Sequence, residues 1–222
     1  MNPDLFQKSE ICLYCQKKFK TMKVKTKAVR LLKQDTDFCP TYQGENPYYY
    51  TVNICPYCGM AFTEGFDPIR ESVLSELRES YLNKVRGLNL CGPRTIQEAI
   101  KSFQLALLCA EIIQERDLIK ANMCLAIAWL YRIKGDKEGE KTYLEKALNG
   151  FIYVYERDRT RSEELQKVLY LIGELYARQN QYEASAKWFN ILFSQPVLEP
   201  AIETIARERW QEIRFQYKYS NK

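Results

Sequence analysis

Cys55-Pro56-Tyr57-Cys58-Gly59 contains one of two Cys-x-x-Cys pairs in this chain, and the other lies upstream in Cys12-Leu13-Tyr14-Cys15. Each pair can wrap a tight turn around a metal ion and offer two thiolates, so two pairs supply the four ligands of a tetrahedral structural zinc. A site with four sulfur ligands is closed, because no coordination position remains for water or substrate. The sequence therefore predicts one structural zinc ion per chain, with the ligands Cys12, Cys15, Cys55 and Cys58.

Cys-Pro-Tyr-Cys is also the active-site tetrapeptide of glutaredoxin-like thiol oxidoreductases. Their chemistry needs a thiol of lowered pKa, which usually lies at a helix N-terminus. Here Gly59 follows the second cysteine, and Gly65, Asp67 and Pro68 come soon after, so we expect no helix to begin there. A glycine in this place instead permits the left-handed turn of a metal-binding knuckle. We favour structural zinc and keep a thiol redox protein as an alternative.

The composition limits the possible functions. The chain has 222 residues, 46% of them hydrophobic, which is enough for one large folded domain or two modest ones. It contains no histidine, which removes the commonest general base and the Ser-His and Cys-His nucleophile pairs. It also lacks a glycine-rich nucleotide loop, a run of about 18 apolar residues and a signal peptide. We expect a cytoplasmic protein without membrane contact, and no group of residues suggests a catalytic site.

Four cysteines remain outside the predicted metal site. Cys91, Cys109 and Cys124 lie in or beside helical patterns, as small apolar core residues do. Cys39 lies in Asp37-Phe38-Cys39-Pro40 and can be a packed free thiol or an alternative metal ligand. We favour the packed thiol.

The net charge of +5 is concentrated in the first 34 residues, where nine Lys or Arg face only two acidic residues. Residues 22–27 alternate lysine with Met, Val or Thr, the pattern of a strand with one exposed face. Residues 48–54 are rich in strand-forming side chains and lead directly into the second Cys pair. Two knuckles and two strands predict a zinc ribbon.

The lysine-rich strand has three interpretations. Lysine-lined zinc ribbons can bind the phosphate backbone of a nucleic acid. Exposed lysines also discourage edge-to-edge pairing of strands, and they can bind an acidic protein. Because lysine rather than arginine dominates, we favour a solvated strand edge and keep nucleic-acid binding as an alternative.

After Asp67-Pro68 the hydrophobic period changes to about 3.6 residues, so we place a domain boundary at residue 66. The zinc-ribbon-like segment is then 1–66 and the helical domain 67–222. A first helix is expected over residues 69–85, and Thr95-Ile96-Gln97-Glu98 predicts a capped start for the next.

Two later segments, 128–136 and 173–182, can be superposed in sequence. Each has a small residue, a tyrosine three positions later and a polar turn before a second amphipathic helix. This pattern resembles the tetratricopeptide repeat, and segment 200–217, with proline in its first turn, is suited to close the stack. The predicted fold is mainly α, with a small β zinc ribbon followed by a tetratricopeptide-like helical repeat stack.

Several short motifs together resemble a bacterial family of unknown function, in which a zinc-ribbon-like segment precedes a tetratricopeptide-like domain. They are Cys12-x2-Cys15, Phe19-Lys20-Thr21, Asp37-Phe38, Gly44-Glu45-Asn46-Pro47-x-Tyr49-Tyr50, Cys55-Pro56-x-Cys58-Gly59 and Gly173-Glu174-Leu175-Tyr176. The resemblance covers nearly the whole chain and implies a fold and a metal, but no activity. Its four knuckle cysteines correspond to the four predicted ligands, whereas Met60 replaces an expected aromatic residue.

We hypothesise a non-enzymatic adaptor that binds an unidentified protein or peptide through its helical repeats, an inference from fold-level analogy. In this repeat class the first helix of each pair lines the inner face. The residues predicted on that face are Asn122, Trp129, Arg132, Lys167, Tyr170, Glu174 and Arg178. Arg132, Lys167 and Arg178 can hold a carboxylate from an acidic segment or a chain terminus. The alternative is that all seven are ordinary solvated residues of a helix face.

Overall fold

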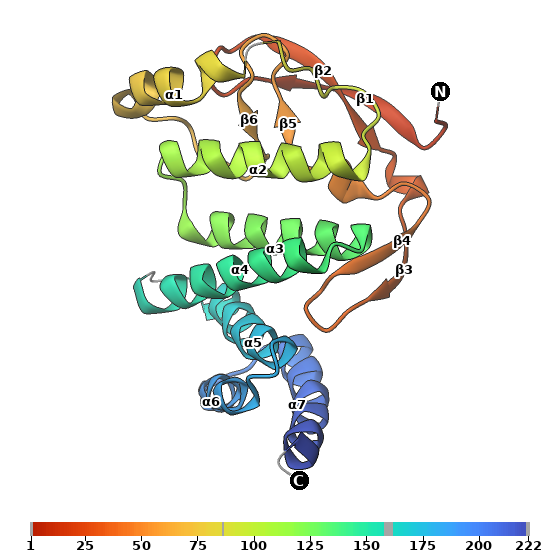
Figure 1. The fold of residues 1–222 in the computed structure, drawn as a ribbon, viewed down its shortest axis with the longest axis vertical. Helices are drawn as coiled ribbons and strands as arrows, with labels where there is room; N and C mark the ends of the chain where they lie inside the picture. Colours follow the sequence, from red (N-terminus) through yellow and green to blue (C-terminus); the bar gives the residue numbers. More distant parts are fainter. Residues whose placement is uncertain (1, 86, 158–161, 221–222) are drawn as a thin grey trace.

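A computed structural model describes residues 2–85, 87–157 and 162–220 and shows hairpins of the N-terminal part lying against a stack of helices (Figure 1). The strands are β1 (Leu5–Ile11), β2 (Lys18–Val24), β3 (Arg30–Gln34), β4 (Pro40–Gln43), β5 (Asn53–Ile54) and β6 (Ala61–Phe62). The α-helices are α1 (Leu74–Ser80), α2 (Ile96–Ile112), α3 (Asp117–Lys134), α4 (Lys137–Arg157), α5 (Ser162–Arg178), α6 (Tyr182–Phe193) and α7 (Pro200–Ser220). The prediction of a mainly α fold with small β elements at the N-terminus is confirmed.

The strands form three separate antiparallel hairpins, β1–β2, β3–β4 and β5–β6. In the first hairpin Leu5 pairs with Val24, and Ile11 pairs with Lys18. The two Cys-x-x-Cys pairs occupy the turns of the first and third hairpins. The turn of the second hairpin carries residues 35–38, which we call the acidic turn.

The predicted strands differ from the observed ones. Strand β2 begins at Lys18, earlier than expected, and its partner β1 was not expected at all. Residues 48–54 form a 3-10 helix (Pro47–Tyr50) followed by the short β5. The reason is local, because the Asn46 side chain caps this 3-10 helix by accepting a hydrogen bond from the amide of Tyr48 (2.9 Å).

The single helix expected over residues 69–85 is broken into three pieces. A 3-10 helix (Glu71–Val73) precedes α1, and a second one (Leu82–Lys84) follows it. The break falls at Tyr81, whose backbone leaves helical geometry (φ −129°, ψ −63°) and whose buried side chain donates from its hydroxyl to the carbonyl oxygen of Gly59 (3.0 Å). A tertiary contact with the third hairpin, whose turn carries Cys55 and Cys58, therefore overrides the helical pattern.

The long helices begin and end at the expected signals. Helix α2 starts at a capping box, in which the Thr95 hydroxyl accepts from the Glu98 amide (3.3 Å) and the Glu98 carboxylate accepts from the Thr95 amide (2.8 Å). Helix α3 ends at Gly135 in the left-handed conformation (φ 80°), two residues before α4. Helix α7 begins at Pro200.

Neighbouring helices approach closely where one of them has a small residue. A Cβ atom added at Gly173 of α5 would lie 2.8 Å from the ring of Phe189 in α6. The Phe189 ring is fully buried and also lies against the ring of Trp210 in α7 (centroids 5.7 Å apart). Such contacts fit a helical repeat stack, although the tetratricopeptide-like repeat itself stays a prediction.

One cluster of buried side chains runs from Cys12 through the helices to Ile213. The hairpins and the helices therefore share a core, with Ala61 and Phe62 of β6 belonging to it. A shared core does not tell whether either part folds alone, so the boundary at residue 66 stays a prediction. Within the described residues, no helix is both long and apolar enough to span a membrane.

Candidate functional site

The four predicted metal ligands come together at the tips of the first and third hairpins. Their sulfur atoms all lie within 4.8 Å of one another. The Sγ atoms of Cys12 and Cys58 are 3.5 Å apart, and those of Cys15 and Cys55 are 3.6 Å apart. Among the residues that the structure describes, no other group of three or more Cys, Asp or Glu side chains has the geometry to hold a metal ion. The cluster therefore suggests metal binding through four thiolates.

The two turns that carry these cysteines have the same backbone design. The amide of Gln16 donates to the Cys12 carbonyl oxygen (3.1 Å), and the amide of Gly59 donates to that of Cys55 (2.8 Å). Gln16 and Gly59 both have positive φ, 57° and 82°. At Gly59 a Cβ atom would lie 2.5 Å from a methyl group of Val85, so only glycine fits. The left-handed turn predicted at Gly59 is confirmed.

A state of the cluster in which all four cysteines are protonated is unfavourable, because the thiols lie close together. The hydrogen bond between Cys12 and Cys58 lowers the pKa of Cys12 to about 5 and raises the pKa of Cys58. Burial raises the pKa of Cys55 to about 11. The cluster thus holds one readily formed thiolate, Cys12, beside two thiols of raised pKa, Cys55 and Cys58. A cation bound between the sulfurs would stabilise all four as thiolates.

The surroundings close the cluster. Cys12 and Cys55 are fully buried, and Cys15 and Cys58 are half-buried. Strand β2 follows the first pair and strand β6 the second, so no helix begins directly after either pair, as expected for the second one. Cys39 lies outside the cluster and is buried, and burial raises the pKa of its thiol to about 11.

The seven residues predicted to bind a partner lie on helices α3 and α5, on what we call the α3/α5 face. They are Asn122, Trp129, Arg132, Lys167, Tyr170, Glu174 and Arg178. Asn122 and Lys167 are exposed, the two arginines are half-buried and the other three are buried. The buried and half-buried members contact the acidic turn or side chains around it. The central part of this face is therefore covered by the chain itself.

Asp37 is the centre of this contact and is completely buried. Arg132 donates from Nη1 to Oδ1 (3.0 Å) and from Nη2 to Oδ2 (2.6 Å) of Asp37, and Trp129 donates from Nε1 to Oδ2 (3.1 Å). Nη1 of Arg132 also donates to Asp35 (3.1 Å). Burial alone would raise the pKa of Asp37, but the hydrogen bond from Arg132 and the charge of Arg178 hold that pKa below its ordinary value.

Thr36 is bound by helix α5, and α7 supports this contact through Arg209. Its carbonyl oxygen accepts a hydrogen bond from the Tyr170 hydroxyl (2.8 Å), and its own hydroxyl donates to Glu174 (2.5 Å). Arg178 donates from Nη2 to the Thr36 hydroxyl (3.0 Å), and Arg209 of α7 donates to Glu174 (2.5 Å). Side chains of α5 therefore bind both the backbone and the side chain of Thr36.

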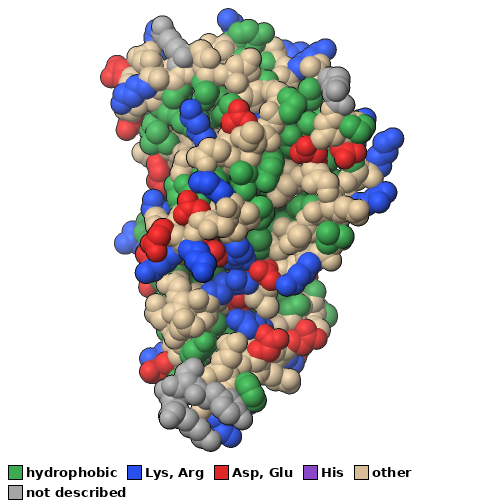
Figure 2. Space-filling view, turned by 45° about the vertical axis from the view of Figure 1, so that its right-hand side comes forward, with side chains coloured by type: hydrophobic (Ala, Val, Ile, Leu, Met, Phe, Trp, Pro, Cys, Tyr) green, Lys and Arg blue, Asp and Glu red, His purple; other side chains and the backbone are tan. Residues whose placement is uncertain are grey.

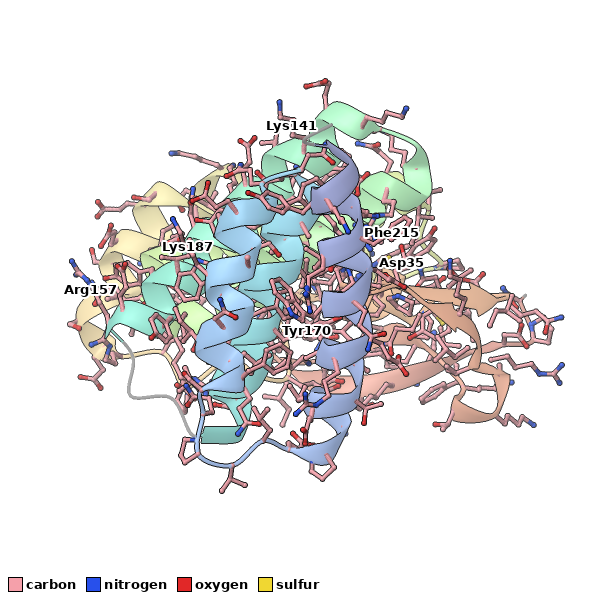
Figure 3. All side chains as sticks on the ribbon, turned by 90° about the horizontal axis from the view of Figure 1, so that it is seen from below. Asp35, Lys141, Arg157, Tyr170, Lys187 and Phe215 are labelled. Atoms are coloured by element: carbon pink, nitrogen blue, oxygen red, sulfur yellow. The ribbon has the colours of Figure 1, made fainter. Side chains whose placement is uncertain are left out.

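Phe38 completes the contact. Its ring centroid lies 5.2 Å from that of Tyr170, and the Lys167 ammonium lies 5.3 Å from the Phe38 ring centroid. In the view of Figure 3, Asp35 lies between α7 and the hairpins and Tyr170 lies among the helices, whereas Lys141 lies at the periphery.

An open groove of about 530 Å³ lies beside the acidic turn, between residues 48–65 and helix α3. Asn122, Trp129 and Lys167 line it, so three of the seven predicted residues border open space. The half-buried side chains of Tyr48 and Ile119 add apolar surface. The view in Figure 2 shows basic and acidic side chains interspersed over the face it presents, without a large area of one sign.

The lysine-rich segment is partly neutralised by the chain itself. Lys8 donates to Glu64 (2.7 Å), and Lys23 donates to the Tyr50 carbonyl oxygen (2.9 Å) and lies 3.7 Å from Glu64. Lys18 and Lys20 of β2 are exposed on either side of the buried Phe19. The alternation predicted over residues 22–27 is wrong, because Lys23, Val24 and Lys25 are all half-buried and a 3-10 helix (Thr26–Ala28) follows the strand. Binding of a nucleic acid stays a prediction.

Sequence reasoning did not find the role of the acidic turn or of Arg209. The available signal is that Asp35 and Asp37 directly follow the basic segment, so two carboxylates stand at the tip of a predicted turn. Nothing in the local pattern tells which distant side chains these carboxylates meet.

The comparisons with known proteins place the chain in one family. Residues 5–213 match the family described as uncharacterized protein conserved in bacteria (DUF2225). The match spans most of the chain, which therefore belongs to this family. No curated protein and no solved structure shows a significant match.

Proposed function

We propose that this member of the family is a non-enzymatic, cytoplasmic adaptor, in which the four cysteines bind one structural zinc ion and the α3/α5 face binds another protein. The closed cysteine cluster supports the structural part of the proposal. The groove beside the acidic turn supports the binding part, because it presents polar and apolar side chains of a helical stack to the solvent.

The geometry of the cluster fits zinc. A tetrahedron with zinc–sulfur bonds of about 2.3 Å has edges of about 3.8 Å. The sulfur–sulfur distances of Cys12–Cys58 (3.5 Å) and Cys15–Cys55 (3.6 Å) are close to that edge. Four soft thiolates also favour zinc over magnesium or calcium, which prefer oxygen ligands.

A zinc ion here would supply folding free energy rather than chemistry. The third hairpin has only two residues in each strand, so it buries little apolar surface by itself. The four cysteines also close the chain between Cys15 and Cys55, which contains the acidic turn. Metal binding would therefore hold both ends of the segment that covers the α3/α5 face.

The groove is the observation that carries the adaptor proposal. Asn122 can bind the backbone of an extended segment, and Lys167 can bind an acidic side chain. Tyr48 and Ile119, which line the groove and are half-buried, offer apolar contact to the same segment. A partner with an acidic and partly apolar segment fits this arrangement.

The test is affinity purification from the native cell with a Lys167→Glu protein. We expect this variant to keep its metal and its helical spectrum and to lose the proteins that copurify with the wild type. Lys141→Glu is the matched control, since Lys141 is an exposed lysine of α4 at the periphery (Figure 3). If both variants retain the same partners, the groove is not the binding surface.

The alternative function, nucleic-acid binding, is supported by the exposed lysines of β2. Lys18 and Lys20 point away from the buried Phe19, and Lys27 and Arg30 nearby are also exposed. Binding through these side chains would weaken steeply as salt rises, because counterions are released from the phosphates. Filter binding of generic RNA and DNA tests it, and absence of retention at low salt would exclude this function.

The second alternative, a thiol redox protein, is supported only by the lowered pKa of Cys12. A redox dithiol must be free of metal during its reaction. Persistent metal in freshly purified protein would therefore exclude this function.

A further inference from the structure

We propose that Arg132 and Arg178 form a receptor for an acidic segment of a partner protein, and that the acidic turn is a tethered occupant which such a segment replaces. This inference rests on the proposed function, since it names the partner chemistry and the regulation of the same face. The protein would then be autoinhibited until a partner competes with its own turn.

The two arginines are held in place by helical carboxylates that leave their outer nitrogens free for a ligand. Nε of Arg132 donates to Glu140 (2.6 Å), and Nε of Arg178 donates to Glu174 (2.8 Å). Both Nη atoms of Arg132 and the Nη2 atom of Arg178 point instead at the acidic turn. The donors are thus preorganised by the helices, which lowers the entropy cost of binding an anion.

The receptor binds two carboxylates, Asp35 and Asp37, that are separated by one residue. Asp37 receives a bidentate pair of hydrogen bonds from Arg132 and a third from Trp129. Asp35 accepts from Arg132 at 3.1 Å and lies 3.5 Å from Nη2 of Arg178. A peptide with a single acidic residue would leave part of this donor set unpaired, which is costly at a buried site.

The positions between and after the two carboxylates are recognised as well. Glu174 and Arg178 bind the Thr36 hydroxyl, and Tyr170 donates to the backbone carbonyl oxygen. The Phe38 ring lies against Tyr170 and below Lys167. The expected ligand is therefore an acidic segment of the form Asp-Thr-Asp-Phe, with serine able to replace threonine, that adopts the tight turn of residues 35–38, in which the Phe38 amide donates to the Asp35 carbonyl oxygen (2.9 Å).

The rest of the second hairpin is weakly attached. All five residues of β3 are exposed, including Leu31 (54%) and Leu32 (64%). Burial is confined to Asp37, Cys39 and Pro40 at the tip and the start of β4. A hairpin held mainly by its tip can leave as a unit once the tip is displaced.

Competition with a tethered ligand needs a second contact. An occupant on a short tether has an effective concentration in the millimolar range. The open groove can supply the second contact, because Trp129 and Lys167 belong both to its lining and to the surroundings of the acidic turn. A partner bound in the groove would therefore place its acidic segment next to the receptor.

The test uses a synthetic peptide of residues 33–40 with Cys39 replaced by serine, and a control peptide with both aspartates replaced by asparagine. The second protein carries Asp35→Asn and Asp37→Asn. These substitutions keep the size of both side chains but remove the charges that hold the acidic turn on the arginines, so we call this variant the opened protein. We expect the acidic peptide to bind this protein at least tenfold more tightly than the wild type, and the control peptide to show no binding. Adding Arg178→Gln to the opened protein should abolish binding.

The result that overturns the proposal is an opened protein with wild-type helicity and metal content that binds neither peptide. If the opened protein does not fold, hydrogen exchange of wild-type residues 30–43 decides, and we expect faster exchange in millimolar acidic peptide. Unchanged exchange there would equally overturn the proposal. Neither the peptide binding nor the hydrogen exchange involves a native partner. These experiments can therefore refute the receptor proposal while the groove proposal stands, and the copurification experiment can refute the groove proposal while the receptor proposal stands.

Discussion

The hairpins and the helical stack are held together by different kinds of interaction. The strands of the hairpins are short. Leu5, Met22 and Tyr50 form a small cluster of their own, while other buried side chains such as Phe19 and Phe62 belong to the core shared with the helices. The helices bury large rings such as Phe189 and Tyr170 against one another. We therefore expect the first region to need its cysteines as well as the shared core, and the second to depend on packing.

The acidic turn joins these two regions by charge. Its tip belongs to the hairpins, while its partners Arg132 and Arg178 belong to the helices. Loss of the metal, of a core ring or of a turn carboxylate should therefore have distinct consequences. The following changes test whether the regions depend on such different forces.

The largest effect is expected from removing one metal ligand. Cys55→Ser should lose the metal and unfold the two Cys hairpins, destabilising the chain by on the order of 5 kcal/mol or more. Elemental analysis and denaturant titration measure both changes. Cys91→Ser is the control, since this half-buried thiol lies outside the cluster. A Cys55→Ser protein as stable as this control would show that the hairpins do not depend on a metal.

The next largest effect concerns the helical core. Phe189→Ala should cost about 3–5 kcal/mol, because the ring is fully buried between α5, α6 and α7. The metal content should be unchanged, which separates this effect from the previous one. Phe215→Ala, at a ring that is 64% exposed, is the matched control. Equal midpoints of chemical unfolding for the two variants would contradict the assigned packing.

Breaking the charged contact between the regions should have an intermediate effect. Asp37→Asn should lower the free energy of unfolding by about 2–3 kcal/mol. The guanidinium group of Arg132 then donates to an uncharged and weaker acceptor at a buried position. Asp117→Asn removes an exposed ion pair with Lys120 and should cost well under about 1 kcal/mol. Denaturant titration of both variants makes the comparison, and similar losses would mean that the turn is not tightly bound.

The smallest effect is expected from pH. The pKa of Asp37 is depressed in the folded protein below 3.8, so its stabilising contribution is fully present above that pH and is lost as the pH falls through the folded pKa. The stability difference between wild type and Asp37→Asn should be constant from pH 5 to 8 and shrink below about pH 3.8. Taking this difference cancels the protonation of the cysteines, which both proteins share. A difference that already shrinks near pH 6 would contradict a depressed pKa.

How much the sequence predicts depends on the range of the interaction. The Cys pairs, the capping box at Thr95 and the proline that begins α7 are local signals, and each predicted feature is present. The strand expected over residues 48–54 fails because Asn46 caps a 3-10 turn, a local signal that strand propensity concealed. The broken helix at Tyr81 and the position of the acidic turn depend on contacts between distant residues. Periodicity alone carries no record of such contacts.

Native mass spectrometry of freshly purified protein is the most direct test of whether the four cysteines bind zinc and thereby organise the hairpins. We predict a mass that exceeds that of the chain by one zinc ion, with protons lost from the coordinating thiols, and eight unmodified cysteines after denaturation. The opposite result is a folded, metal-free chain. It would show that the four cysteines do not hold zinc and that the hairpins are organised by another force.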